Sequence, residues 1–273
     1  MSAFLTDVTD MWFRGLNHDL RRYVIFAVAV WVTLWVVLRV AIRPRKIRDT
    51  SPPARQLISE FLFSTRSIAV FSSVSVGINL LERAGAYPLQ KLAVSWGASW
   101  FWVSLVAMIV AHDAYIYWTH RWMHHPRLFR WSHLRHHRSH NPSPFTAYSF
   151  DIAEALVNVA FVFAWPMIFP TAWEVIGLFM LHQIFRNTML HCGYELMPAR
   201  ADGRPWLDFL TTTTHHDLHH AQAGYNYGAW FTWWDRWMGT EHPDYLERYA
   251  KVAWRPNIPR PLAEALSPFD RTI

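Results

Sequence analysis

The sequence predicts an all-α fold, an integral membrane helical bundle with a histidine-rich cap. Hydrophobic residues make up 52% of the 273 residues and charged residues 17%, whereas roughly a quarter of the residues of an ordinary soluble domain are charged. Several apolar runs are long enough to cross a hydrocarbon core as helices. The 16 histidines are concentrated in the segments that follow these runs, so the cap should lie at the ends of the helices.

The first three apolar runs predict three membrane-crossing helices. Residues 23–42 read YVIFAVAVWVTLWVVLRVAI, with a single charge at Arg39, and this length suffices for one crossing. A second run covers residues 67–81. The third, at 92–118, is too long for one bare crossing, so its last turns should project from the membrane and carry residues 120–125.

The last two apolar runs, at residues 152–169 and 172–190, predict a helical hairpin. Only a Pro-Thr pair separates them, and Pro166 should kink the first helix. Everything after His191 is too polar to cross, although short helices are expected there. Five crossings result, with short re-entrant hairpins as the alternative for the second run and for this last pair.

Five crossings fix the sidedness of the chain. They place the basic loop at 43–55, the segment 120–149 and the C-terminal region on one face, with the links at 82–91 and 170–171 on the other. Because cytoplasmic loops carry an excess of Lys and Arg, we expect the metal-binding, histidine-rich cap on the cytoplasmic side. The N-terminus then lies outside, although three arginines near it oppose that orientation.

Two triplets of the form His-x-x-His-His are the strongest chemical signal, one at residues 133–137 and one at 216–220. A third cluster occupies residues 120–125. On a helix, positions i, i+3 and i+4 share a face, so each cluster can present imidazoles, common ligands of iron, zinc and copper, to one point. The single cysteine, Cys192, excludes a cysteine-based site. The number of imidazoles exceeds what one tetrahedral zinc uses, which indicates two metal ions.

The candidate metal ligands are the clustered histidines and an i, i+4 pair at the end of the last apolar run. They are His120, His124, His125, His133, His136, His137, Asn187, His191, His216, His219 and His220.

Three choices among the histidines stay open. Either His124 or His125 completes the first cluster. His215 remains an alternative to His216, and His182, about two turns from His191, is a weaker candidate. Isolated histidines are expected to be structural or loop residues rather than ligands, namely His18, His112, His140 and His242.

Four strings carry a resemblance to the fatty acid hydroxylase/sterol desaturase superfamily. YWTHRWMHHP at 117–126 and HLRHHRSHNP at 133–142 resemble its first two histidine boxes. HCGYELMP at 191–198 is similar to a segment before the last box of sterol C4-methyl oxidases. HHDLHHAQAGYNYGAWFTWWDRWMGTE at 215–241 resembles the last box of sterol C5-desaturases.

The resemblance implies a non-haem di-iron enzyme that uses O2 and two external electrons to hydroxylate or desaturate a lipid. It implies two iron ions, for which zinc can substitute, held by the histidines named above. Asn187 stands where some members have another histidine and could bind through a water. The resemblance also implies three parts, an N-terminal segment with the first helix at 1–60, the di-iron domain at 61–245 and a tail at 246–273.

Carboxylates close in sequence to the ligands should orient the imidazoles through their second nitrogens. An ion pair between Asp235 and Arg236 is the preferred alternative for that aspartate. The candidates are Asp113, Asp151, Glu154, Asp217 and Asp235.

The expected partners are a lipid substrate, the membrane and a separate electron donor, either a ferredoxin or a cytochrome b5 system. The sequence contains no haem or flavin domain, so the electrons should come from another protein. Nucleic acid is not expected, because no basic helix or RNA-binding motif occurs. Four arginines could dock an acidic donor or, equally, bind anionic headgroups, namely Arg127, Arg130, Arg135 and Arg138.

A histidine-rich zinc or nickel transporter is the alternative function. Transporters place their ligands near the bilayer midplane on broken helices, whereas these clusters should lie beyond the crossings on one face. A soluble zinc hydrolase conflicts with the apolar runs. The sequence leaves the lipid open among sterol, fatty acyl, sphingolipid and carotenoid classes, and it does not separate hydroxylation from desaturation.

Overall fold

The computed structural model describes residues 2–254, which confirm the all-α prediction. The described part contains isolated β-bridges but no strand. Most of the predicted tail at 246–273 lies outside the described residues. The helices are α1 Ser2–Trp31, α2 Ala54–Arg83, α3 Leu89–Ser95, α4 Gly97–Met123, α5 Pro126–Ser132, α6 Leu134–His137, α7 Ile152–Ile168, α8 Trp173–Leu190, α9 Thr213–Ala221, α10 Trp233–Trp237 and α11 Tyr245–Val252.

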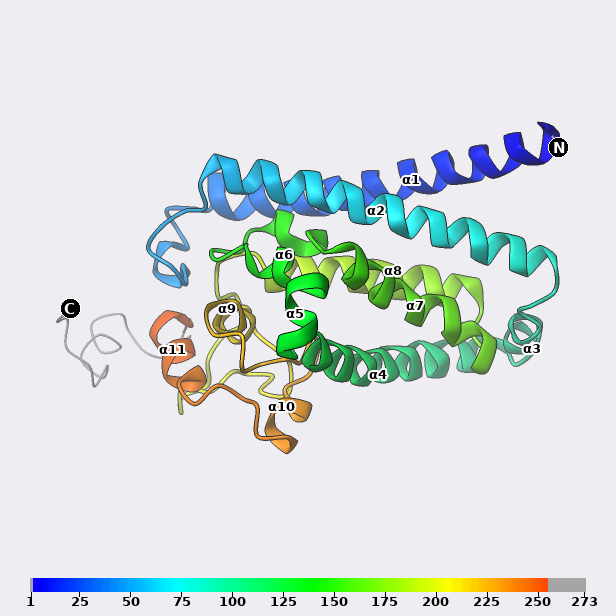
Figure 1. The fold of residues 1–273 in the computed structure, drawn as a ribbon. Helices are drawn as coiled ribbons and strands as arrows, with labels where there is room; N and C mark the ends of the chain where they lie inside the picture. Colours follow the sequence, from blue (N-terminus) through cyan, green and yellow to red (C-terminus); the bar gives the residue numbers. More distant parts are fainter. Residues whose placement is uncertain (1, 255–273) are drawn as a thin grey trace.

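Three helices among the described residues are long and apolar enough to cross a membrane, namely Ala3–Val37, α2 and α4. They coincide with the first three predicted crossings. The other two predicted crossings correspond to α7 and α8, which are 17 and 18 residues long. These two helices lie between α2 and α4 (Figure 1), and side chains of both pack in one apolar cluster. Whether they cross the bilayer stays a prediction.

The boundaries of two helices differ from the prediction. The first helix begins at Ser2 and continues through a π-helical segment, Val32–Val37, so residues 38–42 of the predicted crossing leave the helix. The third apolar run is divided between α3 and α4 at Gly97, whose φ of 77° is strained for any residue with a Cβ. Pro166 lies inside α7, two residues before the helix ends at Ile168, and the predicted kink stays a prediction.

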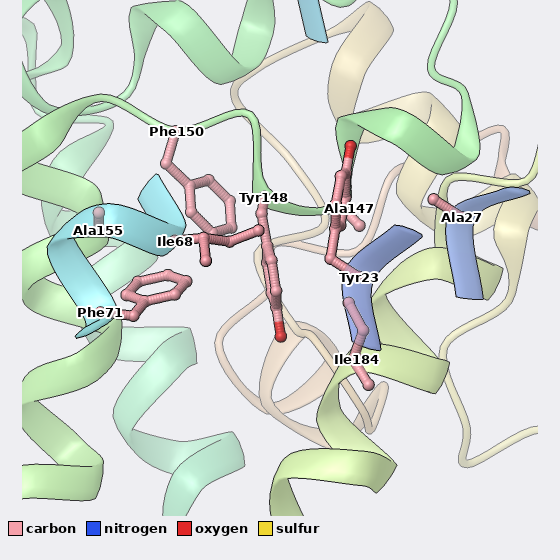
Figure 2. Packing of buried hydrophobic residues seen from close by; sticks show 9 residues of the cluster. All are labelled: Tyr23, Ala27, Ile68, Phe71, Ala147, Tyr148, Phe150, Ala155 and Ile184. Carbon is pink, nitrogen blue, oxygen red and sulfur yellow. The ribbon is translucent and has the colours of Figure 1, made fainter. Parts of the chain in front are cut away.

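Helices α1 and α2 pack along their length (Figure 1) and hold the segment that follows α6. Tyr148 of this segment stands at the centre of an apolar cluster (Figure 2). Its ring stacks on Tyr23 at 5.8 Å between centroids and meets the edge of Phe71 at 5.3 Å. The hydroxyls of Tyr23 and Ser64 both donate to the carbonyl oxygen of Phe145 at 2.9 Å. The chain beyond the second histidine cluster is thereby fixed to two long helices.

A second apolar cluster packs α4, α7 and α8 together and includes Ala93 of α3. Met108 and Phe179 are fully buried within it, and Phe161 packs against them. Helices α5, α6 and α9 and the 43–55 loop lie at one end of the bundle, and α3 and the N-terminus lie at the other (Figure 1). The structure therefore confirms that the histidine clusters share one face. The assignment of that face to the cytoplasm stays a prediction.

Candidate metal centre

The histidine clusters come together at the end of the bundle from four places in the chain. The first cluster ends α4, the second surrounds α6, His191 caps α8 and the last cluster forms α9. The Thr212 side chain caps α9, and the Glu195 carboxylate accepts from the backbone N–H of Thr214 at 2.9 Å. These are the acceptors that a helix N-terminus favours. Eight of the nine residues of α9 are buried, and the register of this short helix fixes three imidazoles.

Nine imidazoles divide into two groups, and within each group the candidate ligand atoms all lie within 4.8 Å of one another. We call them group one and group two. Group one consists of His120, His124, His133, His137 and His219. Group two consists of His136, His191, His216 and His220.

The Nε2 atoms converge in both groups. In group one, Nε2 of His137 lies 3.2 Å from that of His124 and 3.0 Å from that of His219, and those two are 3.2 Å apart. His120 and His133 are joined at 2.9 Å. In group two, Nε2 of His191 is the common neighbour, at 2.9 to 3.3 Å from the Nε2 atoms of His136, His216 and His220.

Each triplet is divided between the two groups. Residues at i and i+4 stay together, as His133 and His137 do in group one, while His136 faces group two. The helix turns about 100° per residue, so positions i and i+4 are about 40° apart but i and i+3 about 60° apart in the opposite sense. Each triplet therefore offers two imidazoles to one group and its third imidazole to the other, so it bridges the two groups.

The Nδ1 atoms, which we call the outer nitrogens, explain why these Nε2 atoms are free to bind. Nδ1 of His120 lies 2.8 Å from the carbonyl oxygen of Tyr227, Nδ1 of His219 lies 2.6 Å from that of Tyr225, and Nδ1 of His191 lies 2.7 Å from that of Asn187. A carbonyl oxygen only accepts, so each of these Nδ1 atoms carries the proton. The corresponding Nε2 atoms therefore present lone pairs to their neighbours.

The converging lone pairs are better suited to binding a cation than to hydrogen bonding between the imidazoles. The Nε2 lone pair of His191 can accept one hydrogen bond, yet three imidazole nitrogens surround it. Metal–imidazole bonds of about 2.1 Å would separate neighbouring nitrogens by about 3.0 Å at 90° and about 3.4 Å at the tetrahedral angle. The observed separations of 2.9 to 3.3 Å match this spacing, so the residues present fit a metal ion in each group.

Burial keeps these imidazoles neutral, which is the form that binds metal. Burial, with the neighbouring histidines adding to it, lowers the pKa of His137 to about 3. Burial also lowers the pKa of His191 to about 4, against the opposing effect of its bond to Asn187. The same causes hold the pKa well below its usual range for His136, His216, His219 and His220.

A loop organised by Asp235 supplies the two tyrosine carbonyls of group one. The Asp235 carboxylate is buried and accepts from the backbone N–H groups of Tyr227 and Gly228, each at 2.8 Å. The expected ion pair between Asp235 and Arg236 is absent from the described residues, because Arg236 instead pairs with two other carboxylates. A Cβ on Gly228 would lie 2.6 Å from the Phe231 carbonyl oxygen, so this close turn requires glycine.

Of the five carboxylates expected behind the ligands, one contacts a grouped imidazole. Oε2 of Glu154 lies 2.9 Å from Nδ1 of His133. Asp151 accepts from the backbone N–H of Arg135, and Asp217 pairs with Arg48. The main partners of the outer nitrogens are thus backbone carbonyls, which the sequence analysis missed. The Asn-Tyr-Gly string at 226–228 was their only signal.

The remaining candidates lie outside both groups. His125 is exposed at the start of α5, where its ring accepts from the N–H of Arg127. The Asn187 amide donates to the carbonyl oxygen of Ala147. His215 is buried 3.7 Å from Asp235, and His182 packs on Trp230. The histidines expected to be structural are also outside, namely the buried His112 and His242 and the exposed His18 and His140.

A cavity adjoins both groups on the side of the bundle. Imidazoles of His120, His136 and His191 line it together with apolar residues such as Ile116 and Leu190. It lies between α4, α7 and α8, so it connects the histidines with the apolar helices.

Comparison with known proteins agrees with this arrangement. The family profile described as fatty acid hydroxylase matches residues 105–240. The Mus musculus protein named lathosterol oxidase is 31% identical over 196 residues, which are 70% of this chain and 64% of that protein. Delta(7)-sterol 5(6)-desaturase ERG3B of Gibberella zeae is 30% identical over 68% of this chain and 56% of its own length. Methylsterol monooxygenase 1 of Danio rerio is 25% identical over 82% of each chain.

The fold and the two histidine groups define a histidine-box membrane protein. With the matches to the hydroxylase profile and to the sterol desaturases, the chain belongs to the fatty acid hydroxylase/sterol desaturase superfamily. The chain matches less than two thirds of the length of the mouse and Gibberella proteins. No solved structure matches it.

Proposed function

We propose that this chain is a membrane-bound oxygenase that hydroxylates or desaturates a lipid with O2 and two electrons from a separate protein. The observation that carries the proposal is the convergence of nine imidazole nitrogens into two adjacent groups. The printed names of the relatives, which are sterol oxidases, desaturases and a monooxygenase, support a lipid as substrate.

In this proposal the nine grouped histidines hold two iron ions, with zinc as a substitute. His125 and Asn187 are not ligands, because both lie outside the groups. When bound, an iron pair supplies at one place the two electrons needed to begin the reduction of O2. One ion would be held by the group-one histidines, namely His120, His124, His133, His137 and His219. The other would be held by those of group two, namely His136, His191, His216 and His220.

The chain itself would orient the imidazoles and exclude water. Carbonyl bonds to the outer nitrogens keep the ring planes of His120 and His219 fixed before any substrate arrives. The cavity beside them would bring a C–H bond next to the histidines, where a bound lipid displaces water and a strong oxidant meets substrate. Hydroxylation would place one oxygen atom in the lipid and release one water. Desaturation would remove two hydrogens and release two waters, and each reaction consumes two electrons and two protons.

The electron donor would dock beside the second histidine cluster. Arg127, Arg130 and Arg138 are exposed there, so they can attract an acidic ferredoxin or cytochrome b5. Arg135 is less available, because its guanidinium lies 4.0 Å from the centre of the Phe63 ring. The predicted docking surface therefore consists of three arginines rather than four.

The test is turnover by purified, iron-loaded protein with mixed membrane lipids, labelled O2 and a reducing system. We expect labelled oxygen in a lipid product, or a new double bond with labelled water. Both should require O2 and reductant. Product formation without O2 would rule out the oxygenase, and energy-dependent zinc or nickel uptake into vesicles would favour the transporter.

A further inference from the structure

The cavity beside the histidine groups also carries polar residues that hold no metal in the proposed scheme. His112, Asn158 and Gln183 line it from α4, α7 and α8. A polar group between packed helices is costly unless it is paired. Glu154 and Asn187 also line the cavity, but Glu154 lies beside His133 and the Asn187 amide donates to the Ala147 carbonyl oxygen. We call the other three polar residues, His112, Asn158 and Gln183, the polar layer.

His112 offers a buried donor that has no acceptor. The indole nitrogen of Trp230 donates to Nδ1 of His112 at 3.0 Å. Indole N–H only donates, so Nδ1 carries no proton, and the ring is neutral with its proton on Nε2. That Nε2 is buried and has no hydrogen-bond partner among residues 2–254. A buried N–H without an acceptor costs about 1–3 kcal/mol, which indicates that something else is bound there.

The two amides add further free hydrogen-bonding groups. Oε1 of Gln183 accepts from the Tyr148 hydroxyl at 3.0 Å, which orients the amide and leaves its nitrogen available. The Asn158 side chain lines the cavity and makes no hydrogen bond within the described part of the chain. Both residues line the same cavity as His112, so a ligand in it has donors from all three helices beside it.

The polar layer lies at a defined distance from the metal groups. His112 precedes His120 by eight residues on α4, and Gln183 precedes His191 by eight residues along α8. Eight residues of helix correspond to a rise of about 12 Å. Asn158 follows Glu154, the neighbour of His133, by one turn. On α4 and α8 the layer therefore stands about two helical turns from the histidines, deeper in the bundle.

We propose that the polar layer binds an oxygen atom of the lipid and so restricts the substrate to lipids that carry a hydroxyl or carbonyl group about two helical turns from the reacting carbon. This inference rests on the proposed oxygenase for the identity of the reacting end. A lipid without that oxygen would leave the His112 and amide donors unpaired, and sites built to pair such groups reject analogues that lack the partner.

Binding to the zinc-loaded protein tests this without any turnover. The probes are matched sets that differ in one oxygen, namely cholesterol, cholestan-3-one and cholestane, and hexadecan-1-ol, hexadecan-2-one and hexadecane, each titrated in detergent. We expect an oxygenated probe to bind roughly tenfold more tightly than its hydrocarbon, a difference of about 1.4 kcal/mol. The alcohol and ketone arms distinguish a hydroxyl from a carbonyl oxygen.

Asn158→Leu is the decisive variant, because it removes a side-chain amide that makes no hydrogen bond to residues 2–254. It should reduce the preference to about twofold, and Asn158→Gln should restore part of it. Asn79→Leu is the matched control, since this amide is exposed on α2 and bonds only to the Ser75 carbonyl. His112→Phe is a second test, provided that its unfolding temperature shows a folded protein.

Equal binding of oxygenated and hydrocarbon probes to the wild type, or no binding of any oxygenated probe, would overturn the inference. An unchanged preference in folded Asn158→Leu would do the same. A preference that depends on Asn158 in a protein that never consumes O2 would support the polar layer and reject the proposed oxygenase, so the two failures are distinguishable.

Discussion

The two histidine groups differ in what lies behind their imidazoles. In group one, the outer nitrogens of His120 and His219 contact backbone carbonyls, and that of His133 lies 2.9 Å from Glu154 without hydrogen-bond geometry. In group two, His191 alone has such a partner. Within residues 2–254, the outer nitrogens of the other three are buried without a hydrogen-bond partner, namely His136, His216 and His220.

This difference teaches that the protein preorganises one group more than the other. A hydrogen bond to the outer nitrogen fixes the ring orientation and raises the basicity of the ligating nitrogen, and its loss typically lowers metal affinity 10- to 100-fold. We therefore expect group one, with five imidazoles and more outer partners, to hold its ion more tightly than group two.

The largest expected effect comes from removing one ligand from either group. His219 and His220 are neighbours on α9 but belong to different groups, so His219→Ala and His220→Ala compare the groups in nearly the same place. Each should abolish lipid turnover, because the proposed reaction needs both ions. His18→Ala, at an exposed position on α1, should leave turnover unchanged. Full activity in His219→Ala would show that group one is not a metal site.

The next effect concerns the loop behind group one. Asp235→Ala removes the acceptor for two backbone N–H groups and for the Thr240 hydroxyl. We expect a loss of about 3 kcal/mol in the free energy of unfolding, at about 1 kcal/mol for each bond. The group-one ion should also bind at least tenfold more weakly, while the group-two ion is retained. Denaturant unfolding and competition with a chelator measure the two effects, and equal weakening of both ions would contradict the comparison.

Gly228→Ala tests the same loop behind group one by adding a single methyl group. The added Cβ would meet the Phe231 carbonyl oxygen at 2.6 Å and the Asp235 carboxylate at 2.8 Å, so the loop must shift at a cost of about 1–3 kcal/mol. Gly224→Ala is the matched control, because nothing lies within 4 Å of its new Cβ. Thermal unfolding of the two variants should differ, and identical curves would show that the turn is not tight.

Stepwise chelation compares the groups in the unmodified protein. We expect one ion to leave before the other, and the early ion to be that of group two. Metal content followed against chelator concentration would then show two steps, and His220→Ala should lack the first of them. A single step would contradict the predicted difference in metal affinity, and loss of the group-one ion first would reverse it.

The smallest effect should come from the surface outside both groups. Charge reversal at Arg127, Arg130 and Arg138 should slow reduction by an acidic donor a few-fold and weaken its dependence on salt. Metal content should stay fixed. Stopped-flow reduction at several ionic strengths measures this, and an unchanged rate would assign these arginines to lipid headgroups.

The helices and the ligand types could be predicted from the sequence because both depend on local patterns. Apolar runs of sufficient length identified three helices that are long enough to cross a membrane. The histidines of the three clusters, except His125, lie in the two groups. The division of each triplet between two groups also follows from helix geometry, since His133 and His137 are four residues apart and His136 is not in phase with them.

The outer partners could not be predicted, because they depend on contacts between distant segments. Tyr225 and Tyr227 contact the imidazoles through backbone carbonyls, which no residue type marks in a sequence. The exclusion of His125, whose ring turns to the N–H of Arg127, likewise depends on how α4 ends. Acidic residues near the ligands were a poor guide, because most of them bind backbone N–H groups or arginines.

Metal content of the purified, folded protein tests the central claim most directly. The account predicts close to two ions of iron or substituting zinc per chain, falling to about one in both His219→Ala and His220→Ala. One ion or none in the folded wild-type protein would contradict it, as would two ions retained in either variant.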